Sequence, residues 1–198
     1  MKLTSLTRSR TGRVALAAIP VGIVSSLLMA GVANGAVPVA FAVSGSPFKI
    51  AASRLEGTGF SQYGGVATSP DGKTVHPVAI SNIKQASLAD LCQSVVTDTP
   101  LGKVGLLIHA GGGGNPATAS DLQIGLTDLQ GDASFGNIRI GIDASTVKTD
   151  AKGQAGDFAQ DSDSISISGL KQTAWSTQAG VFTLTGLHLQ LTDGEECF

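Results

Sequence analysis

The segment Ser164-Ile165-Ser166-Ile167-Ser168-Gly169-Leu170 places an apolar side chain at every second position and then slips by one residue at a glycine. Alternation with a period of two puts one face of an extended strand in a core and the other face in water. The same alternation recurs from Ile138 to Ile142 and from Leu187 to Leu191, whereas the 3.6-residue period of a helix is not sustained after residue 43. The sequence therefore predicts an all-β fold.

The slip at the glycine belongs to a pattern of apolar, any, apolar, Ser or Thr, any, then Leu or Ile. A slip by one residue turns the later side chains to the wrong face unless the strand bulges or bends there. Kinks at one level in neighbouring strands predict a single antiparallel curved sheet or half-barrel, whereas turns between separate strands predict a β-sandwich. The five copies begin at Ile50, Val78, Ile124, Ile165 and Phe182, and four of them carry Asn82, Asp128, Gly169 or Gly186 as the extra residue, which suits a left-handed backbone.

The first 40 residues have the features of an export signal. Basic residues precede a nearly unbroken apolar run from Val14 to Val43. Such a start is typical of a segment that enters the membrane as a helix and keeps its positive end in the cytoplasm. Because about 20 apolar residues span a bilayer, this helix is either a cleaved signal peptide or an uncleaved N-terminal anchor. In both cases we expect residues 41–198 to form one domain that is extracellular or at the cell surface.

The charge of this domain limits its partners. From residue 43 onward it has nine basic and fifteen acidic side chains. Binding to nucleic acid requires basic surface that displaces counterions, and a polybasic hold on anionic lipid requires the same. The sequence therefore argues against a nucleic-acid partner.

Two cysteines are present, Cys92 and Cys197. An even number of cysteines in an exported chain predicts one disulfide, although two free thiols remain the alternative. A disulfide here would close a loop of about 105 residues. The chain-entropy model assigns to such a loop on the order of 4–5 kcal/mol of stability.

Motifs for catalysis and metal binding are weak. The G-x-S-x-G turn of α/β hydrolases is missing, and the glycines after His109 are more typical of a loop than of an oxyanion hole. Asp157, Asp161 and Asp163 are oxygen ligands that suit calcium, as is the acidic run 193–196, but charged loop residues that face solvent are commoner. We therefore predict neither a metal nor a cofactor.

The chain resembles a family of exported proteins of Streptomyces and related actinobacteria, a domain of unknown function whose members often carry the label cholesterol esterase. The likeness covers nearly everything after residue 40. It is carried by Phe41-Ala42-Val43-Ser44-Gly45, Gly57-Thr58-Gly59-Phe60, Tyr63-Gly64-Gly65, His76-Pro77-Val78-Ala79, Leu91-Cys92-Gln93-Ser94-Val95, Asn137-Ile138-Arg139-Ile140-Gly141 and Glu195-Glu196-Cys197-Phe198.

Two functional hypotheses follow. The first is a non-enzymatic secreted or cell-envelope β-domain that binds a lipid or sterol-like ligand, or that is a structural surface protein in contact with a membrane or envelope protein. The second is the lipid-ester hydrolase that the family label implies. For that reaction the residues to test are Ser94 as the nucleophile and His76 as its base, since both lie in stretches that match the family.

Overall fold

The computed structural model describes residues 40–42, 45–69, 72–100 and 102–198. The expected N-terminal signal or anchor helix lies, up to residue 39, outside the described residues. Residues Pro38–Phe198 form one compact unit. In the described residues we find no helix with the length and hydrophobicity required to cross a membrane.

The described part of the chain forms one ten-stranded sheet, with antiparallel pairing throughout except for the parallel pair of β1 and β2. The all-β class and the single antiparallel sheet are thereby confirmed. A short 3-10 helix, η1 (Ala144–Thr146), follows β7. The strands are β1 (Ala40–Ala42), β2 (Phe48–Thr68), β3 (Val75–Ala89), β4 (Leu91–Thr99), β5 (Gly102–Ala110), β6 (Ala117–Gly136), β7 (Arg139–Asp143), β8 (Phe158–Gln178), β9 (Val181–Thr183) and β10 (His188–Thr192).

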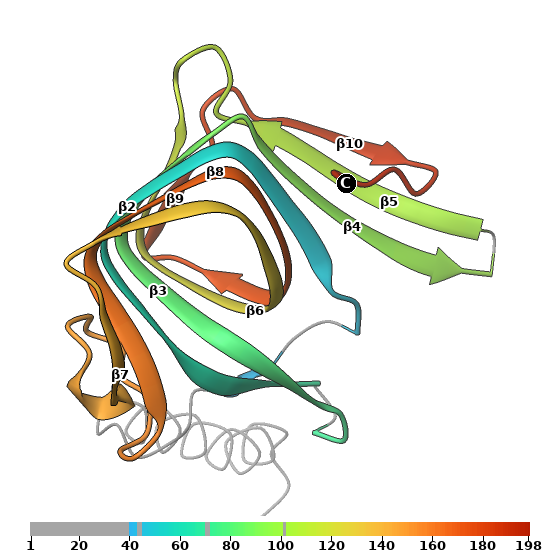
Figure 1. The fold of residues 1–198 in the computed structure, drawn as a ribbon. Helices are drawn as coiled ribbons and strands as arrows, with labels where there is room; N and C mark the ends of the chain where they lie inside the picture. The colour runs from blue at the N-terminus through green and yellow to red at the C-terminus, as the bar shows by residue number, and fades with distance from the viewer. Residues whose placement is uncertain (1–39, 43–44, 70–71, 101) are drawn as a thin grey trace, which may run out of the picture. The chain divides into compact units, whose positions relative to one another are not determined.

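Four long strands close on themselves, because β8 pairs with β2 as well as with β6 (Figure 1). The stagger is large. The register leads from Gly64 on β2 through Ala79, Leu126 and Ala174 back to β2 at Phe48, near the opposite end of that strand. A closed sheet with so much stagger requires strands that are steeply tilted to its axis. The curvature thus goes beyond the expected half-barrel, and the four strands form a small closed barrel.

Kinks in neighbouring strands coincide at two levels, which is what lets the sheet curl. At the first level the pairing of β2 with β8 is interrupted between Ser53 and Gly169, which lie opposite each other. Gly169 has φ 63°. At the second level Lys84 on β3 is paired with neither of its neighbouring strands. It lies opposite Gly59 on β2, which has φ 66°, and opposite Asp121 on β6, which has φ 49°. Left-handed residues interrupt the pleat at each level, so the strands bend together.

Three of the slips differ from the predicted ones. On β6 the register shifts at Thr127, one residue before Asp128. Gly186 lies in the turn between β9 and β10 rather than inside a strand. Asn82 stays in register with both neighbouring strands, so β3 has no bulge there.

The apolar spacing changes by one residue between Ile80 and Ile83 because β3 is buried on both faces. Ile83 belongs to the main core inside the barrel, whereas Ile80 packs in a second cluster on the other face. Ala144 and Val147, from the segment after β7, cover that second cluster. The change from Ile80 to Ile83 therefore reflects two different cores and not a kink.

The barrel core contains one buried amide with an unmatched donor. Gln172 is 2% exposed, and its Nε2 has no hydrogen-bond partner. Gln172 lies opposite Ile50 on one side and Leu129 on the other. By contrast, the buried amide of Gln123 donates to Asn82 Oδ1 at 2.6 Å and accepts from Gln178 Nε2 at 2.7 Å.

Replacing Gly169 with alanine should lower the free energy of unfolding by about 1–2 kcal/mol, because a left-handed backbone is costly for residues with a Cβ. No atom lies within 4 Å of the new Cβ, so the cost is conformational and not steric. Gly64→Ala is the matched control: its Cβ also meets nothing, and Gly64 is not left-handed. Denaturant titration of the disulfide-bonded protein measures both. Equal effects of the two substitutions would contradict the assigned kink.

Gln172→Leu should raise the free energy of unfolding by about 1 kcal/mol, because an unmatched buried donor costs roughly 1–3 kcal/mol that leucine avoids. Gln123→Leu should have the opposite sign, since it leaves the bonded groups of Asn82 and Gln178 without their partner. Thermal and denaturant unfolding of the two variants side by side give both signs. A destabilised Gln172→Leu would mean that its amide is satisfied after all.

Candidate functional site

Strands β4, β5 and β10 leave the barrel as a three-stranded arm (Figure 1). β4 pairs with β2 only over Lys49–Ala51, β5 pairs with β4, and β10 pairs with β5. One edge of β10 has no strand partner among the described residues, since β10 ends the order of the sheet. The arm therefore offers two faces and a free edge.

The C-terminal tail covers one face of the arm. A disulfide joins Cys92 on β4 to Cys197, which confirms the predicted pair. The backbone N–H of Cys197 donates to Ser94 Oγ at 3.0 Å. Lys49 holds the end of the tail: its Nζ donates to Glu196 Oε2 at 2.7 Å and to the Phe198 carbonyl at 2.8 Å.

The opposite face of the arm is mostly apolar and partly uncovered. Its rows begin in the barrel core, where Ile50 is 4% exposed, and end on β10, where Leu189 is 52% and Leu191 is 73% exposed. Cross-strand neighbours share a face, so the register defines this surface. We call it the arm face: Gln93, Val95 and Thr97 of β4, Val104, Leu106 and Ile108 of β5, and Leu189 and Leu191 of β10.

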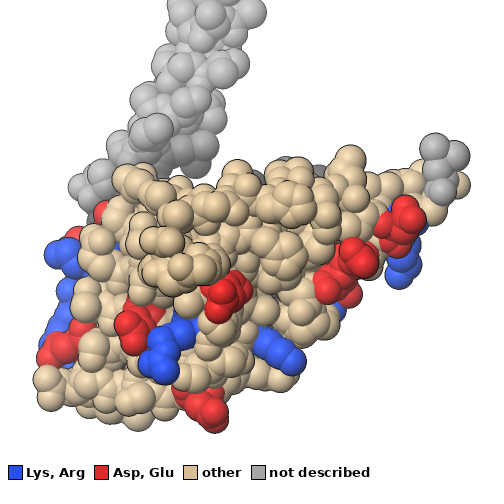
Figure 2. All heavy atoms as spheres, turned by 90° about the horizontal axis from the view of Figure 1, so that it is seen from above, with Lys and Arg blue, Asp and Glu red and all other residues tan. Residues whose placement is uncertain are grey.

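None of the eight side chains of the arm face is charged. Elsewhere the charges are scattered and do not form a patch of one sign on the side seen from above (Figure 2). The alternation of Leu187, Leu189 and Leu191 predicted leucines in a core, and this prediction is wrong, because all three are more than half exposed. The signal that identifies Leu189 and Leu191 is the combination of alternation with a position on an edge strand, which only the topology reveals.

The structure does not join the two residues singled out for hydrolysis. Ser94 is 1% exposed beneath the tail, and its hydroxyl accepts from Cys197 N–H. His76 stacks on Trp175, with ring centroids 3.6 Å apart. The two residues pair with opposite ends of β2, Ser94 with Lys49 and His76 with Ala67. Their partnership in ester hydrolysis stays a hypothesis without a supporting contact.

The other two histidines do come together, which sequence reasoning missed. His109 and His188 face each other across β5 and β10, and Cys92 lies opposite His109 on β4. All three lie on the face of the arm that carries Ser94. Because Cys92 is held in the disulfide, no thiol is available to these imidazoles.

Two of the aspartates considered for calcium, Asp161 and Asp163, hold the segment after β7 in place. Asp161 is fully buried and accepts from Arg139 Nε at 2.8 Å and from the Lys148 backbone N–H at 2.8 Å. The hydrogen bond from Arg139 is the main reason why the pKa of Asp161 lies below its usual value. Asp163 accepts from Lys148 Nζ at 2.6 Å. Within the described residues, no three His, Cys, Asp or Glu side chains form a metal-binding group.

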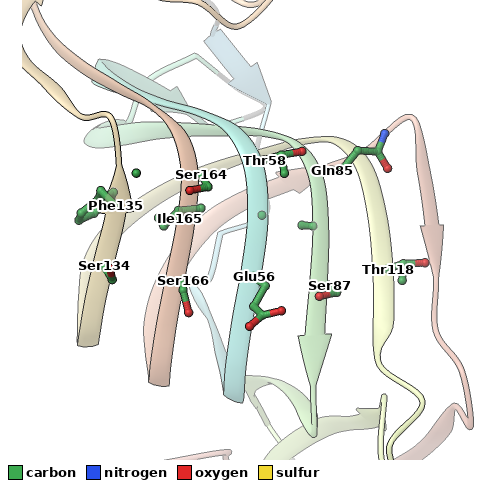
Figure 3. A pocket seen from close by; sticks show the side chains of 13 residues that line it. Glu56, Thr58, Gln85, Ser87, Thr118, Ser134, Phe135, Ser164, Ile165 and Ser166 are labelled. Atoms are coloured by element: carbon green, nitrogen blue, oxygen red, sulfur yellow. The ribbon is translucent and has the colours of Figure 1, made fainter.

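The described residues of the barrel form concavities at two places that bear on the site. The larger, of about 630 Å³, is a shallow groove in which short polar side chains from β2, β3, β6 and β8 stand side by side (Figure 3). Among them are Glu56, Thr58, Ser87, Ser134 and Ser166. A second hollow of about 330 Å³ lies between the kink at Gly59 and the segment Lys148–Ala151. Neither includes a residue of the arm face.

Comparison with known proteins gives a family but no activity. No curated protein and no solved structure matches the chain. The model of one protein family, described as a family of unknown function (DUF6230), matches residues 44–198, which include the barrel, the arm and the tail. The chain therefore belongs to this family of unknown function.

Proposed function

We propose that this domain is a non-enzymatic binding module of the cell exterior, and that its arm face binds a lipid surface. The observation that carries the proposal is the apolar set of Val95, Val104, Leu106 and Ile108 with Leu189 and Leu191, the last two of which are more than half exposed. An apolar surface that is contiguous and lies at one end of a fold is typical of an interaction site.

The energy of the contact favours an apolar partner. Full burial of a leucine side chain contributes about 1.5–3 kcal/mol relative to leaving it in water. Leu191, Leu189 and Val104 are 73%, 52% and 43% exposed, so roughly half of this contribution is unused in the free protein. A partner that covers the three side chains gains several kcal/mol without reorganising the arm.

The absence of charge on the arm face favours lipid over a polar partner. A polar partner would bury hydrogen-bonding groups against a face on which only Gln93 and Thr97 can match them, at a cost of about 1–3 kcal/mol for each group left unmatched. Hydrocarbon has no such groups. The three-stranded arm also presents these side chains on one face, where a single surface can contact them together.

Location outside the cytoplasm is part of the proposal. Its support is the basic and apolar N-terminal sequence and the disulfide between Cys92 and Cys197, which is stable in an oxidising compartment. A signal peptide or an anchor would both deliver the arm to the outer side of the membrane.

Leu191→Asn should reduce binding to phosphatidylcholine vesicles about tenfold or more, because it removes one large apolar contact of the arm face. Zwitterionic lipid is the appropriate probe, since the acidic domain would be repelled by an anionic surface. Flotation of disulfide-bonded protein with vesicles measures the bound fraction.

The matched control is Val181→Asn on β9, where the side chain is 61% exposed but lies outside the arm face. This variant should bind vesicles as the unchanged protein does. Vesicles that leave the unchanged protein in solution, or equal losses for both variants, would overturn the proposal. Circular dichroism confirms that each variant is folded.

A further inference from the structure

We propose that two copies of this protein associate through the free edge of β10, antiparallel, about a two-fold axis at Gln190. The two arms then form one continuous six-stranded sheet. This inference concerns the edge of the arm, whereas lipid binding concerns its face, and it does not depend on lipid.

The edge of β10 lacks the features that prevent pairing. Exposed edges in soluble proteins are usually blocked by lysine, proline or a bulge. The five residues His188-Leu189-Gln190-Leu191-Thr192 include no proline and no charged Lys, Arg, Asp or Glu, and they keep regular register with β5. Among the described residues no strand covers the outer edge of β10.

The register of the pair follows from the sequence. An antiparallel pair centred on Gln190 uses all five residues of both strands and places His188 opposite Thr192 of the second copy. It also places Leu189 opposite the second copy's Leu191. Since directly opposed residues share a face, the leucines of both copies come to lie on the same side.

This arrangement continues the apolar rows of each arm into the other. The row of Ile108 and Leu189 meets the row of Leu191 and Leu106 from the second copy. Each leucine that ends a row in one copy gains an apolar neighbour, and the two arm faces become one surface. No other register of these five residues pairs the strands over their full length.

Residues 188–192 include no Lys, Arg, Asp or Glu. No like charges meet along residues 188–192. Association therefore needs no compensation for charge repulsion at the contact itself.

The size of the contact indicates a weak dimer. Stable interfaces bury about 800 Å² on each partner, which is more than a five-residue edge and its leucines provide. We expect association at high protein concentration, and stronger association where the protein is concentrated on a surface.

The experiment introduces a charged side chain in place of Gln190. This residue lies on the proposed two-fold axis, and its side chain is on the face opposite the leucines. Sedimentation equilibrium of the disulfide-bonded protein without lipid should show a reversible dimer. Gln190→Lys and Gln190→Glu should each weaken it about tenfold or more, because like charges are then directly opposed. An equimolar mixture of the two variants should dimerise again, because opposite charges then meet.

Recovery in the mixture separates this mechanism from misfolding, which mixing would not correct. Gln85→Lys, an exposed glutamine on β3, is the matched control and should leave the dimer unchanged. A protein that stays monomeric at millimolar concentration would overturn the proposal, as would a mixture that fails to recover. Vesicle flotation of Gln190→Lys distinguishes the dimer proposal from the lipid proposal. This variant should still bind vesicles, because its arm face is intact.

Discussion

The structure depends on the limited hydrogen-bonding capacity of β2, since a strand has only two edges. β8 occupies one edge of β2 from Phe48 to Tyr63, and this pairing closes the barrel. β3 occupies the other edge from Arg54 onward, which leaves only Lys49–Ala51 for β4. β5 and β10 can then add only to the far side of β4. The arm is therefore a consequence of barrel closure, because β2 offers no further edge to these strands.

Closure in turn requires that the strands bend at the same levels. Ser53 opposite Gly169 and Gly59 beside Lys84 provide two such levels on β2. The hydroxyl of Ser53 also donates to Asp90 Oδ2 at 2.6 Å, and Asp90, with φ 51°, separates β3 from β4. One level thus bends the barrel and also marks the point where the arm departs. Local backbone geometry and topology agree at this position, as expected for a foldable sequence.

The sequence was sufficient for the strand period, the kink at Gly169 and the disulfide, because each has a local signature or a unique partner. It was insufficient for Ile80 and Ile83, since a pattern cannot show that two different cores lie on the two faces of one strand. It also misplaced Leu189 and Leu191, because alternation reveals which side chains share a face and not whether anything covers that face. The candidate site therefore became visible only with the strand order.

The disulfide decides which face of the arm stays uncovered. The tail that follows β10 is short, and Cys197 is bonded to Cys92 on β4, so the tail must cross the arm on the side of Ser94 and Leu107. Thr192 Oγ1 accepts from the Glu195 N–H at 3.0 Å and starts the tail in that direction. Had the tail crossed the other side, it would have covered the leucines. A covalent bond thus keeps polar backbone over one face and leaves the apolar face free, which is the arrangement that binding to an apolar partner requires.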